Sequence, residues 1–245
     1  MAVKVFKRYE RKYLITRSKA EELIDCIGNR IVPDSYCING SKYHIYNIYY
    51  DTENSDIIRR SCEKPYFKEK LRLRAYDNYF DTGRAFLEIK RKVGKVVVKR
   101  RVDISSEEAN GFVTKGEKPV REDMQKINEL AYFISMYDLK PAVFISYDRI
   151  AFNLKDDNKI RLTFDSNIRT RRDRLSFDEG IDGKIILDDE YTVFEVKFPY
   201  ATPFWLSKVL SDLNIYPQGF SKYGEEYKAE KQSSFKNEYI LSNTH

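Results

Sequence analysis

The chain has 245 residues, of which 42% are hydrophobic and 14% aromatic, a composition that excludes general disorder and provides enough apolar side chains for a sizeable core. Lys and Arg number 44 against 38 Asp and Glu, so the formal charge of +6 is compatible with anionic partners but identifies none. Three cysteines without metal-ligand spacing and only two histidines argue against a zinc site, and we expect reduced thiols.

Neither a membrane segment nor a signal peptide is predicted. No apolar run approaches the roughly 18 residues needed to cross a bilayer, and the first residues lack the apolar stretch of a secretory signal. We therefore expect a cytoplasmic protein. Because no repeat, low-complexity tract or linker is evident, we expect a single domain over residues 1–245, with a loose C-terminal tail from about 233 to 245.

The N-terminal half of the chain alternates extended segments with short helices. Strand patterns occur in residues 3–15, 41–51 and 66–76, and in a hairpin over residues 86–103. Thr16 is a suitable N-cap for a helix that continues to about Asn29. A short helical piece is expected over residues 54–61.

The C-terminal half contains longer elements. Ser105 begins a helix, and further helices are expected within residues 120–137, 203–213 and 220–232. Strands are expected over residues 140–154, 159–168 and 191–198, with a turn at 156–158. Residues 169–183 are polar and irregular. Four bases in that stretch form either a basic rim or a solvated turn, and the solvated turn is favoured: Arg169, Arg171, Arg172 and Arg174.

Charges on the predicted strands follow a two-residue alternation. In the hairpin, Glu88, Lys90 and Lys92 share one face, while Leu87 and Ile89 share the other. A charged strand face usually meets solvent or protects a sheet edge from aggregation. Six such strands, however, occur beside amphipathic helices that need an apolar surface to cover. We therefore predict an α+β fold in which about eight antiparallel strands form a barrel-shaped tunnel with a basic lumen, surrounded by amphipathic helices.

The predicted lumen carries more basic than acidic side chains. The basic candidates are Lys12, Lys70, Arg72, Arg74, Lys90, Lys92, Lys99, Arg101, Arg149, Arg161 and Lys197, and the acidic ones are Glu10, Glu88, Asp103, Asp165 and Glu195. Two like charges about 4 Å apart repel by roughly 4 kcal/mol at an effective dielectric constant near 20, so such a lumen favours a polyanionic ligand. Nucleic-acid binding also explains basic faces, but it does not explain a carboxylate two residues from a lysine on three strands.

Eight short motifs, taken in chain order, resemble a known family. RYERKY, KLRLR, FLEIKRK, VVVKRR, SYDR, RLTFD, FEVKF and FSKY resemble the VTC domain, the polyphosphate polymerase domain of the vacuolar transporter chaperone complex, within the CYTH-like group of triphosphate tunnel metalloenzymes. The resemblance extends from about residue 3 to residue 227. It implies a tunnel-shaped barrel that transfers the γ-phosphoryl group of ATP to a growing polyphosphate chain, with a divalent metal that is typically Mn²⁺, or else Mg²⁺.

The resemblance also implies roles for individual residues. The bases expected to bind phosphate during transfer are Lys12, Arg72, Arg74, Lys90, Lys99, Arg149 and Arg161. Further substrate contacts are expected from Lys197, Ser221, Lys222 and Tyr223, and a metal ligand from Glu195, with Glu10 and Glu88 as additional candidates. These roles fit phosphoryl transfer, which depends on positioning and charge neutralisation more than on covalent chemistry.

One departure from the hydrolytic branch of the group concerns the first motif. That branch opens with E-x-E-x-K, whereas this chain has Arg8, Tyr9, Glu10, Arg11 and Lys12, so a base stands where the first metal-binding carboxylate would be. The departure favours a polymerase over a triphosphatase, and a non-catalytic polyphosphate or nucleotide sensor is the third alternative. The expected partners are ATP and inorganic polyphosphate, without nucleic acid.

Overall fold

The computed structural model describes residues 9–37, 40–77, 79–94 and 96–242 of the chain. A single antiparallel sheet dominates it, with eight strands hydrogen-bonded in the order β1-β10-β8-β7-β3-β4-β5-β6. These strands are β1 (Tyr9–Thr16), β3 (Tyr43–Asp51), β4 (Phe67–Tyr76), β5 (Ala85–Val93), β6 (Val96–Ile104), β7 (Lys140–Leu154), β8 (Arg161–Arg171) and β10 (Tyr191–Phe198). Two short strands lie off this path, β2 (Ile31–Pro33) beside β7 and β9 (Lys184–Ile185) beside β8.

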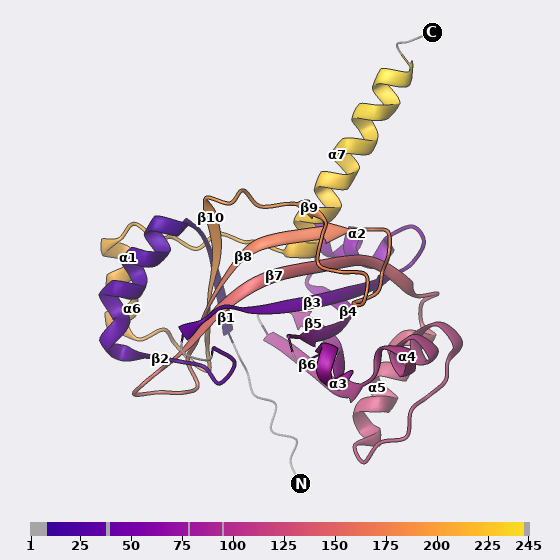
Figure 1. Cartoon of the computed structure of the whole chain (residues 1–245), viewed down its shortest axis with the longest axis horizontal. Helices are drawn as coiled ribbons and strands as arrows, with labels where there is room; N and C mark the ends of the chain where they lie inside the picture. The colour runs from indigo at the N-terminus through magenta and orange to yellow at the C-terminus, as the bar shows by residue number, and fades with distance from the viewer. Residues whose placement is uncertain (1–8, 38–39, 78, 95, 243–245) are drawn as a thin grey trace.

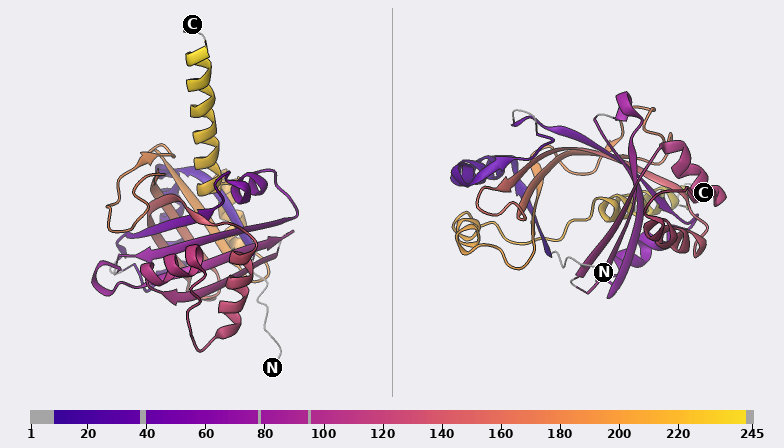
Figure 2. Two further views of the ribbon diagram at one scale, coloured as in Figure 1. Left: turned by 90° about the vertical axis from the view of Figure 1, so that its right-hand side faces the viewer. Right: turned by 90° about the horizontal axis from the view of Figure 1, so that it is seen from below.

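The sheet curls into a half-barrel (Figure 1 and the right-hand view of Figure 2). Strands β1 and β6 stand at the two ends of the strand order, and no backbone ladder joins them within the described ranges. A side-chain contact crosses the gap instead, because Lys90 Nζ on β5 lies 3.1 Å from Glu10 Oε2 on β1. The predicted α+β class and the barrel-type antiparallel sheet of about eight strands are confirmed, the barrel taking the form of a half-barrel.

Helices flank the sheet, and the last one projects from the body of the molecule (Figure 1). They are α1 (Arg17–Ile27), η1 (Gly28–Arg30), α2 (Asp56–Cys62), α3 (Tyr79–Thr82), α4 (Ser106–Asn110), the π-helical turn η3 (Gly111–Lys115), α5 (Met124–Ser135), α6 (Phe204–Asp212) and α7 (Lys222–Ser242). The last helix, expected to end near residue 232, extends to Ser242. In the part of the chain that the structure covers, no helix combines the length and apolar character needed to cross a membrane.

Local signals in the sequence account for several helix ends. Thr16 caps α1, because its side chain accepts a hydrogen bond from the backbone N–H of Lys19. Ser105 and Glu108 form a reciprocal capping box at the start of α4. Both caps were predicted, and strands β7 and β10 have the predicted bounds.

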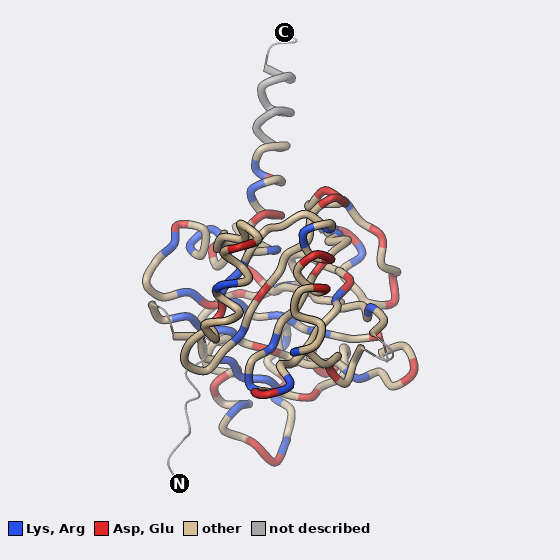
Figure 3. Tube along the Cα trace, turned by 90° about the vertical axis from the view of Figure 1, so that its left-hand side faces the viewer, with Lys and Arg blue, Asp and Glu red and all other residues tan. Residues whose placement is uncertain are grey.

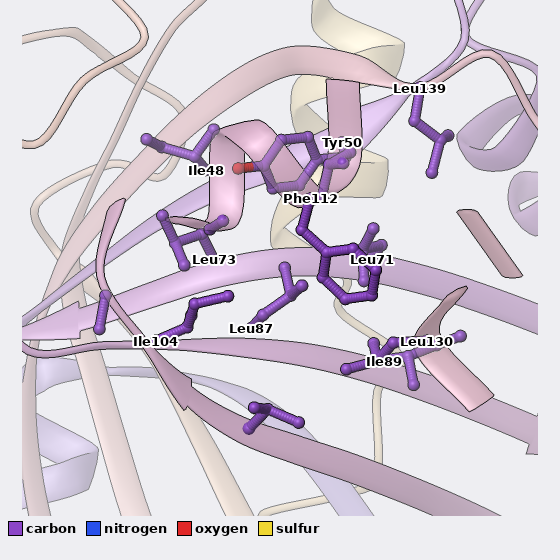
Figure 4. Close-up of a cluster of buried hydrophobic side chains, with 14 of the residues drawn as sticks. Ile48, Tyr50, Leu71, Leu73, Leu87, Ile89, Ile104, Phe112, Leu130 and Leu139 are labelled. Carbon is purple, nitrogen blue, oxygen red and sulfur yellow. The ribbon is translucent and has the colours of Figure 1, made fainter. Parts of the chain in front are cut away.

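The apolar faces of the strands point outward and are covered by helices. On one side, Leu71 and Leu73 of β4 and Leu87 of β5 pack in a buried cluster with Phe112 of η3 and Leu130 of α5 (Figure 4). A second buried cluster joins strands β1, β8 and β10 to helices α1 and α6. Because side chains alternate across a strand, this packing leaves the charged faces on the inside of the curl.

The segment after β8 is organised by Arg171, which is buried. Its guanidinium donates to the backbone carbonyls of Arg174 (3.1 Å), Ser176 (3.0 Å), Gly180 (2.9 Å) and Asp182 (2.9 Å). The expected solvated turn is therefore wrong at this residue, since four carbonyl oxygens take the place of water. Arg172 pairs with Glu226 of α7, so it ties the segment to the last helix.

Candidate functional site

A cavity of about 580 Å³ lies on the charged inner side of the sheet. Thirteen bases line it, Arg11, Lys12, Lys64, Lys68, Lys70, Arg72, Arg74, Lys90, Lys92, Arg149, Lys197, Lys222 and Lys228, against five acids, Glu10, Glu69, Asp165, Glu195 and Glu225. Acidic and basic positions are interspersed along the chain as a whole (Figure 3). The excess of eight positive charges in the cavity exceeds the +6 of the entire chain, so positive charge is concentrated here.

Lys12 lies between two carboxylates where β1 pairs with β10. Its Nζ is 3.3 Å from Glu10 Oε1 and 3.3 Å from Glu195 Oε2, and Lys197 Nζ is 2.5 Å from Glu195 Oε1. Burial alone would raise the pKa of Glu195, but Lys197 and Lys12 hold it well below its ordinary value. Burial lowers the pKa of Lys197 to about 8 in spite of its carboxylate partner. A phosphate entering this cluster would exchange with ion pairs that already exist.

Arg72 of β4 is fixed from two sides. Its Nε and Nη2 donate to Glu88 Oε2 at 2.9 and 2.8 Å, and its Nη1 donates to the Tyr49 hydroxyl at 3.1 Å. Burial would raise the pKa of Tyr49, but Arg72, Lys70 and Arg74 lower it to about 8. The guanidinium is therefore held in place before any ligand arrives.

Arg149 and Lys222 share one buried carboxylate. Arg149 donates to both oxygens of Asp165, at 2.6 and 2.7 Å, and Lys222 Nζ donates to Asp165 Oδ2 at 2.5 Å. Lys222 also lies over the ring of Tyr147, 4.2 Å from its centroid, while the Tyr147 hydroxyl accepts from Arg74 at 3.0 Å. Burial opposes ionisation of Asp165, but the two bases lower its pKa below the ordinary value. Strands β4, β7 and β8 are thus connected to α7 through charged groups.

The connection from α6 to α7 provides a wall that is not part of the sheet (right-hand view of Figure 2). The backbone N–H of Gln218 donates to the Lys12 carbonyl at 2.8 Å, and Lys12 Nζ donates to the Phe220 carbonyl at 3.2 Å. Lys70 Nζ donates to Ser221 Oγ at 2.9 Å. Burial lowers the pKa of Lys70 to about 8, and no carboxylate in the described ranges forms an ion pair with it.

Ten predicted site residues line this cavity together, and four do not. Those in the cavity are Lys12, Arg72, Arg74, Lys90, Arg149, Lys197, Ser221, Lys222, Glu195 and Glu10. Those outside the lining are Lys99, Arg161, Tyr223 and Glu88. The lumen candidates Lys70, Lys92 and Asp165 line the cavity as well, whereas Arg101 and Asp103 do not.

Partners account for two of the residues outside the lining. Arg161 is paired with Asp34, and its Nη2 donates to the Tyr43 hydroxyl at 3.1 Å. Tyr223 is buried, and its hydroxyl donates to Asp51 Oδ2 at 2.9 Å. Both side chains are thus held by partners in this structure, and their predicted contact with substrate stays a prediction.

Glu88 and Lys99 form the other pair outside the lining. Only 1% of the Glu88 side chain is exposed, and Lys99 Nζ lies 2.7 Å from its Oε1. Burial would raise the pKa of Glu88, but Arg72, Arg74 and Lys99 hold it well below its ordinary value. In this structure Glu88 is thus a counter-charge for bases.

Sequence reasoning missed several cavity residues. Lys68 occupies an inward position on β4, and the alternation that identified Lys70 would have found it. Tyr49 and Tyr147 follow the same alternation but carry no charge, so they did not stand out. Lys64 and residues 217–220 lie outside the strands, where strand periodicity gives no signal.

The carboxylates suit a metal only in part. No group of three or more His, Cys, Asp or Glu side chains placed to hold a metal ion occurs in the described portion of the chain. Hard divalent cations in phosphoryl-transfer sites, however, are commonly bound by one or two carboxylates together with phosphate oxygens. Glu10 and Glu195, which contact the same lysine, meet that requirement.

A family profile identifies the chain. The profile described as VTC domain matches residues 7–231, a span that includes the whole curled sheet and every cavity-lining residue. The chain belongs to the VTC domain family. This finding confirms the resemblance carried by the eight motifs.

Two curated relatives of this VTC domain are subunits of a larger assembly. This chain is 29% identical over 189 residues to vacuolar transporter chaperone complex subunit 4 of Schizosaccharomyces pombe, and the match covers 64% of this chain and 26% of that protein. It is 26% identical over 148 residues to subunit 2 of Saccharomyces cerevisiae, covering 51% of this chain and 18% of that protein. The matched part thus spans about a quarter or less of these relatives.

A solved structure shares the architecture of the VTC domain. A candidate adenylate cyclase from Bacillus halodurans is similar with a TM-score of 0.52 and 16% sequence identity, covering 88% of this chain and 94% of that chain. At this identity the likeness concerns the fold alone. It agrees with the tunnel-type fold expected from the CYTH-like motifs.

Proposed function

We propose that this VTC domain is a metal-dependent polyphosphate polymerase that transfers the γ-phosphoryl group of ATP to an inorganic polyphosphate chain. The observation that carries the proposal is the cavity in which thirteen bases face five acids. Such an excess stabilises the charge on a triphosphate and on the phosphoryl group during transfer. Family membership and the similarity to chaperone-complex subunits support the same reading.

The bases divide by geometry into two roles. Arg72 and Arg149 are each held by a carboxylate, so their planar guanidinium groups would bind phosphoryl oxygens with little reorganisation. Lys12 on β1 and Lys197 on β10 supply compact positive charge from one end of the strand order, and Lys90 on β5 supplies it from the other end. Positioning from two sides favours an extended anion over a single phosphate.

Glu195, together with Glu10, would hold the divalent cation, Mn²⁺ or Mg²⁺, with phosphate oxygens as the remaining ligands. When bound, the metal would supply charge neutralisation and orientation of the phosphates. Lys197 and Lys12 lower the pKa of Glu195, and Lys12 and Lys90 lower the pKa of Glu10, so both carboxylates can accept a cation without first losing a proton. Lys12 would then be released to contact phosphate.

Two other functions would use the same cavity. A triphosphatase would pass the phosphoryl group to water, and a sensor would bind the anion without turnover. The base Arg8, in place of a first metal-binding carboxylate, favours the polymerase over the triphosphatase, although this residue lies outside the described ranges.

Incubation with ATP and Mn²⁺, followed by electrophoresis and measurement of ADP and orthophosphate, separates the three. We expect ADP together with long phosphate chains. Orthophosphate without chains would indicate a triphosphatase, and full nucleotide binding without ADP release would indicate a sensor; either result would overturn the proposal.

A matched pair of variants tests the metal-binding role. We expect Glu195→Gln to lower turnover by about 100-fold or more, since it removes an ionised carboxylate from the cavity. Glu21→Gln, on the exposed face of α1, makes the same chemical change outside the cavity and should leave turnover unchanged. Equal turnover in the two variants would show that Glu195 has no role in metal-dependent transfer.

A further inference from the structure

The bases of the cavity differ in how they are neutralised. In its inner part, Lys12 and Lys197 are paired with Glu195, and Lys90 with Glu10. Near the end of α2 and the β5–β6 turn, Lys64, Lys68 and Lys92 line the same cavity. We call these three the outer lysine group. Among the residues that the structure places, no carboxylate lies within ion-pair distance of any of them.

The outer lysines repel one another. Lys68 on β4 is the direct cross-strand partner of Lys92 on β5, an arrangement in which like charges are destabilising. Burial lowers the pKa of Lys68, and the charges of Lys92 and Lys64 lower it further. Lys68 Nζ donates one hydrogen bond, to the Ser61 carbonyl at 3.2 Å, which leaves two of its three N–H groups for a ligand.

The two acids that line the cavity nearest the outer lysine group, Glu69 and Glu225, already have partners. Glu69 Oε1 lies 2.7 Å from Arg91 Nε, and Glu225 Oε1 lies 2.9 Å from Lys228 Nζ. The outer lysine group is therefore a cluster of positive charge without an ion-pair partner among the described residues.

The outer lysines continue a row of bases that begins deeper in the cavity. Lys68, Lys70, Arg72 and Arg74 occupy alternate positions on β4 and all line the cavity. At about 3.4 Å per residue, the row from Lys68 to Arg74 is roughly 20 Å long. Three phosphoryl groups cannot span this distance, so a triphosphate held at Arg72 and Arg74 leaves the outer end of the row unoccupied.

We propose that the outer lysine group is a subsite for the part of an inorganic polyphosphate chain that extends beyond the phosphoryl groups held in the inner cavity. The inference rests on the proposed function and states which of its two substrates the cavity mouth recognises. Flexible ammonium groups without partners suit a repeating anion, since they can follow phosphoryl oxygens in more than one register. A nucleoside, which lacks charge, gains little from them.

Equilibrium titration with size-fractionated long-chain polyphosphate and with tripolyphosphate tests this subsite, in the absence of ATP and metal. We expect the variant Lys64→Gln, Lys68→Gln, Lys92→Gln to lose about tenfold or more in affinity for the long chain and less than about twofold for tripolyphosphate. The salt dependence of long-chain binding should also become shallower, with the slope of log Kd against log salt falling by about two, because three phosphate contacts are lost.

A charge-matched control removes the same three charges elsewhere. Lys19, Lys126 and Lys208 lie on the outer helices α1, α5 and α6, and the variant with Gln at all three positions should bind both anions as the parent does. The outer variant should melt no lower than the parent, because its substitutions relieve repulsion. Unchanged chain preference, equal loss of both anions, or an equal loss in the control would overturn the subsite. Binding of both anions without ATP turnover would instead overturn the polymerase and leave the subsite standing.

Discussion

Glu88 shows how a single buried carboxylate organises the bases around it. Four of them lie within 4.0 Å of its oxygens: Arg72, Arg74, Lys99 and Arg101. A carboxylate in this position offsets repulsion among bases that would otherwise push β4, β5 and β6 apart. We therefore expect substitution of Glu88 to affect the free energy of unfolding more than turnover.

We expect Glu88→Gln to lower the free energy of unfolding by about 3 kcal/mol, because it leaves buried bases without their counter-charge. Glu10→Gln, in the more open cavity, should cost less. Urea denaturation at neutral pH measures both.

Since the pKa of Glu88 is held below its ordinary value, the stability that its ionised form contributes is present above about pH 4.5 and is lost as the pH falls further. The variant should therefore lose less stability than the parent on acidification. Equal stability of parent and variant would contradict this role.

Lys70 gives the site a pH dependence. Burial lowers its pKa to about 8 from the model-compound value of 10.5, whereas a bound phosphate favours its protonated form. We expect tripolyphosphate affinity to fall as the pH rises through about 8 and binding to take up protons there, measured by calorimetry in buffers of different ionisation enthalpy. The ligand-free protein should become more stable over the same interval, because the unfolded chain binds more protons. Lys70→Arg, which stays charged, should reduce the proton uptake. Proton uptake that stays at the parent's level in this variant would show that another group titrates.

The sequence predicted which way most charged side chains of the strands point, but not which residues they pair with. Strand alternation correctly predicted that the side chains of Lys12, Arg72 and Lys197 face the same cavity. It gave Arg161 the same inward direction but could not predict that Asp34, from a segment without strand periodicity, would pair with it. Depth along a tunnel and the identity of an ion-pair partner depend on tertiary packing.

Among the elements, the segment between β8 and β10 contains the clearest structural device outside the cavity. Arg171 donates to four backbone carbonyls and lies over the ring of Phe144, with its Cζ 3.7 Å from the centroid. Hydrogen bonds from a buried charged donor are costly to lose.

We expect Arg171→Lys to lower the free energy of unfolding by about 3 kcal/mol, because lysine cannot satisfy four carbonyls in one plane. Arg174→Lys, at an exposed ion pair with Asp182, should cost less than about 1 kcal/mol. Polymerase activity below the melting temperature should survive in both, since neither residue lines the cavity. Similar melting temperatures for the two variants would show that Arg171 is not a clamp.

Element bounds were predictable for strands of several residues to within a few positions, and not for the shortest strands. β7 and β10 have the predicted bounds, whereas β8, expected over residues 159–168, spans Arg161–Arg171. β2 and β9 span only three and two residues, too short for any periodicity, and they form by pairing with strands already in place. The sequence prediction ended the last helix near residue 232, whereas α7 continues to Ser242.

At the scale of the whole molecule, the net charge is modest although the cavity is strongly basic. Anion binding should relieve the repulsion that folding imposes on that interior. At 100 times its dissociation constant, tripolyphosphate should add about 2.7 kcal/mol to the free energy of unfolding. For a chain of this size, that corresponds to a rise in melting temperature of roughly 5–10 °C.

Thermal unfolding with and without tripolyphosphate measures this effect. Lys90→Gln, in the cavity, should reduce the shift at a fixed ligand concentration, while Lys208→Gln, on α6, should keep it. The absence of a shift in the parent protein would argue against a tunnel that binds phosphates.

The central claim is that the cavity transfers the γ-phosphoryl group of ATP to a phosphate chain. Parallel incubations with ATP radiolabelled at the γ or at the α position, in the presence of Mn²⁺, test it most directly. We predict label in long chains from the γ position and none from the α position. Label that appears only in orthophosphate, or in chains from both positions, would contradict the account.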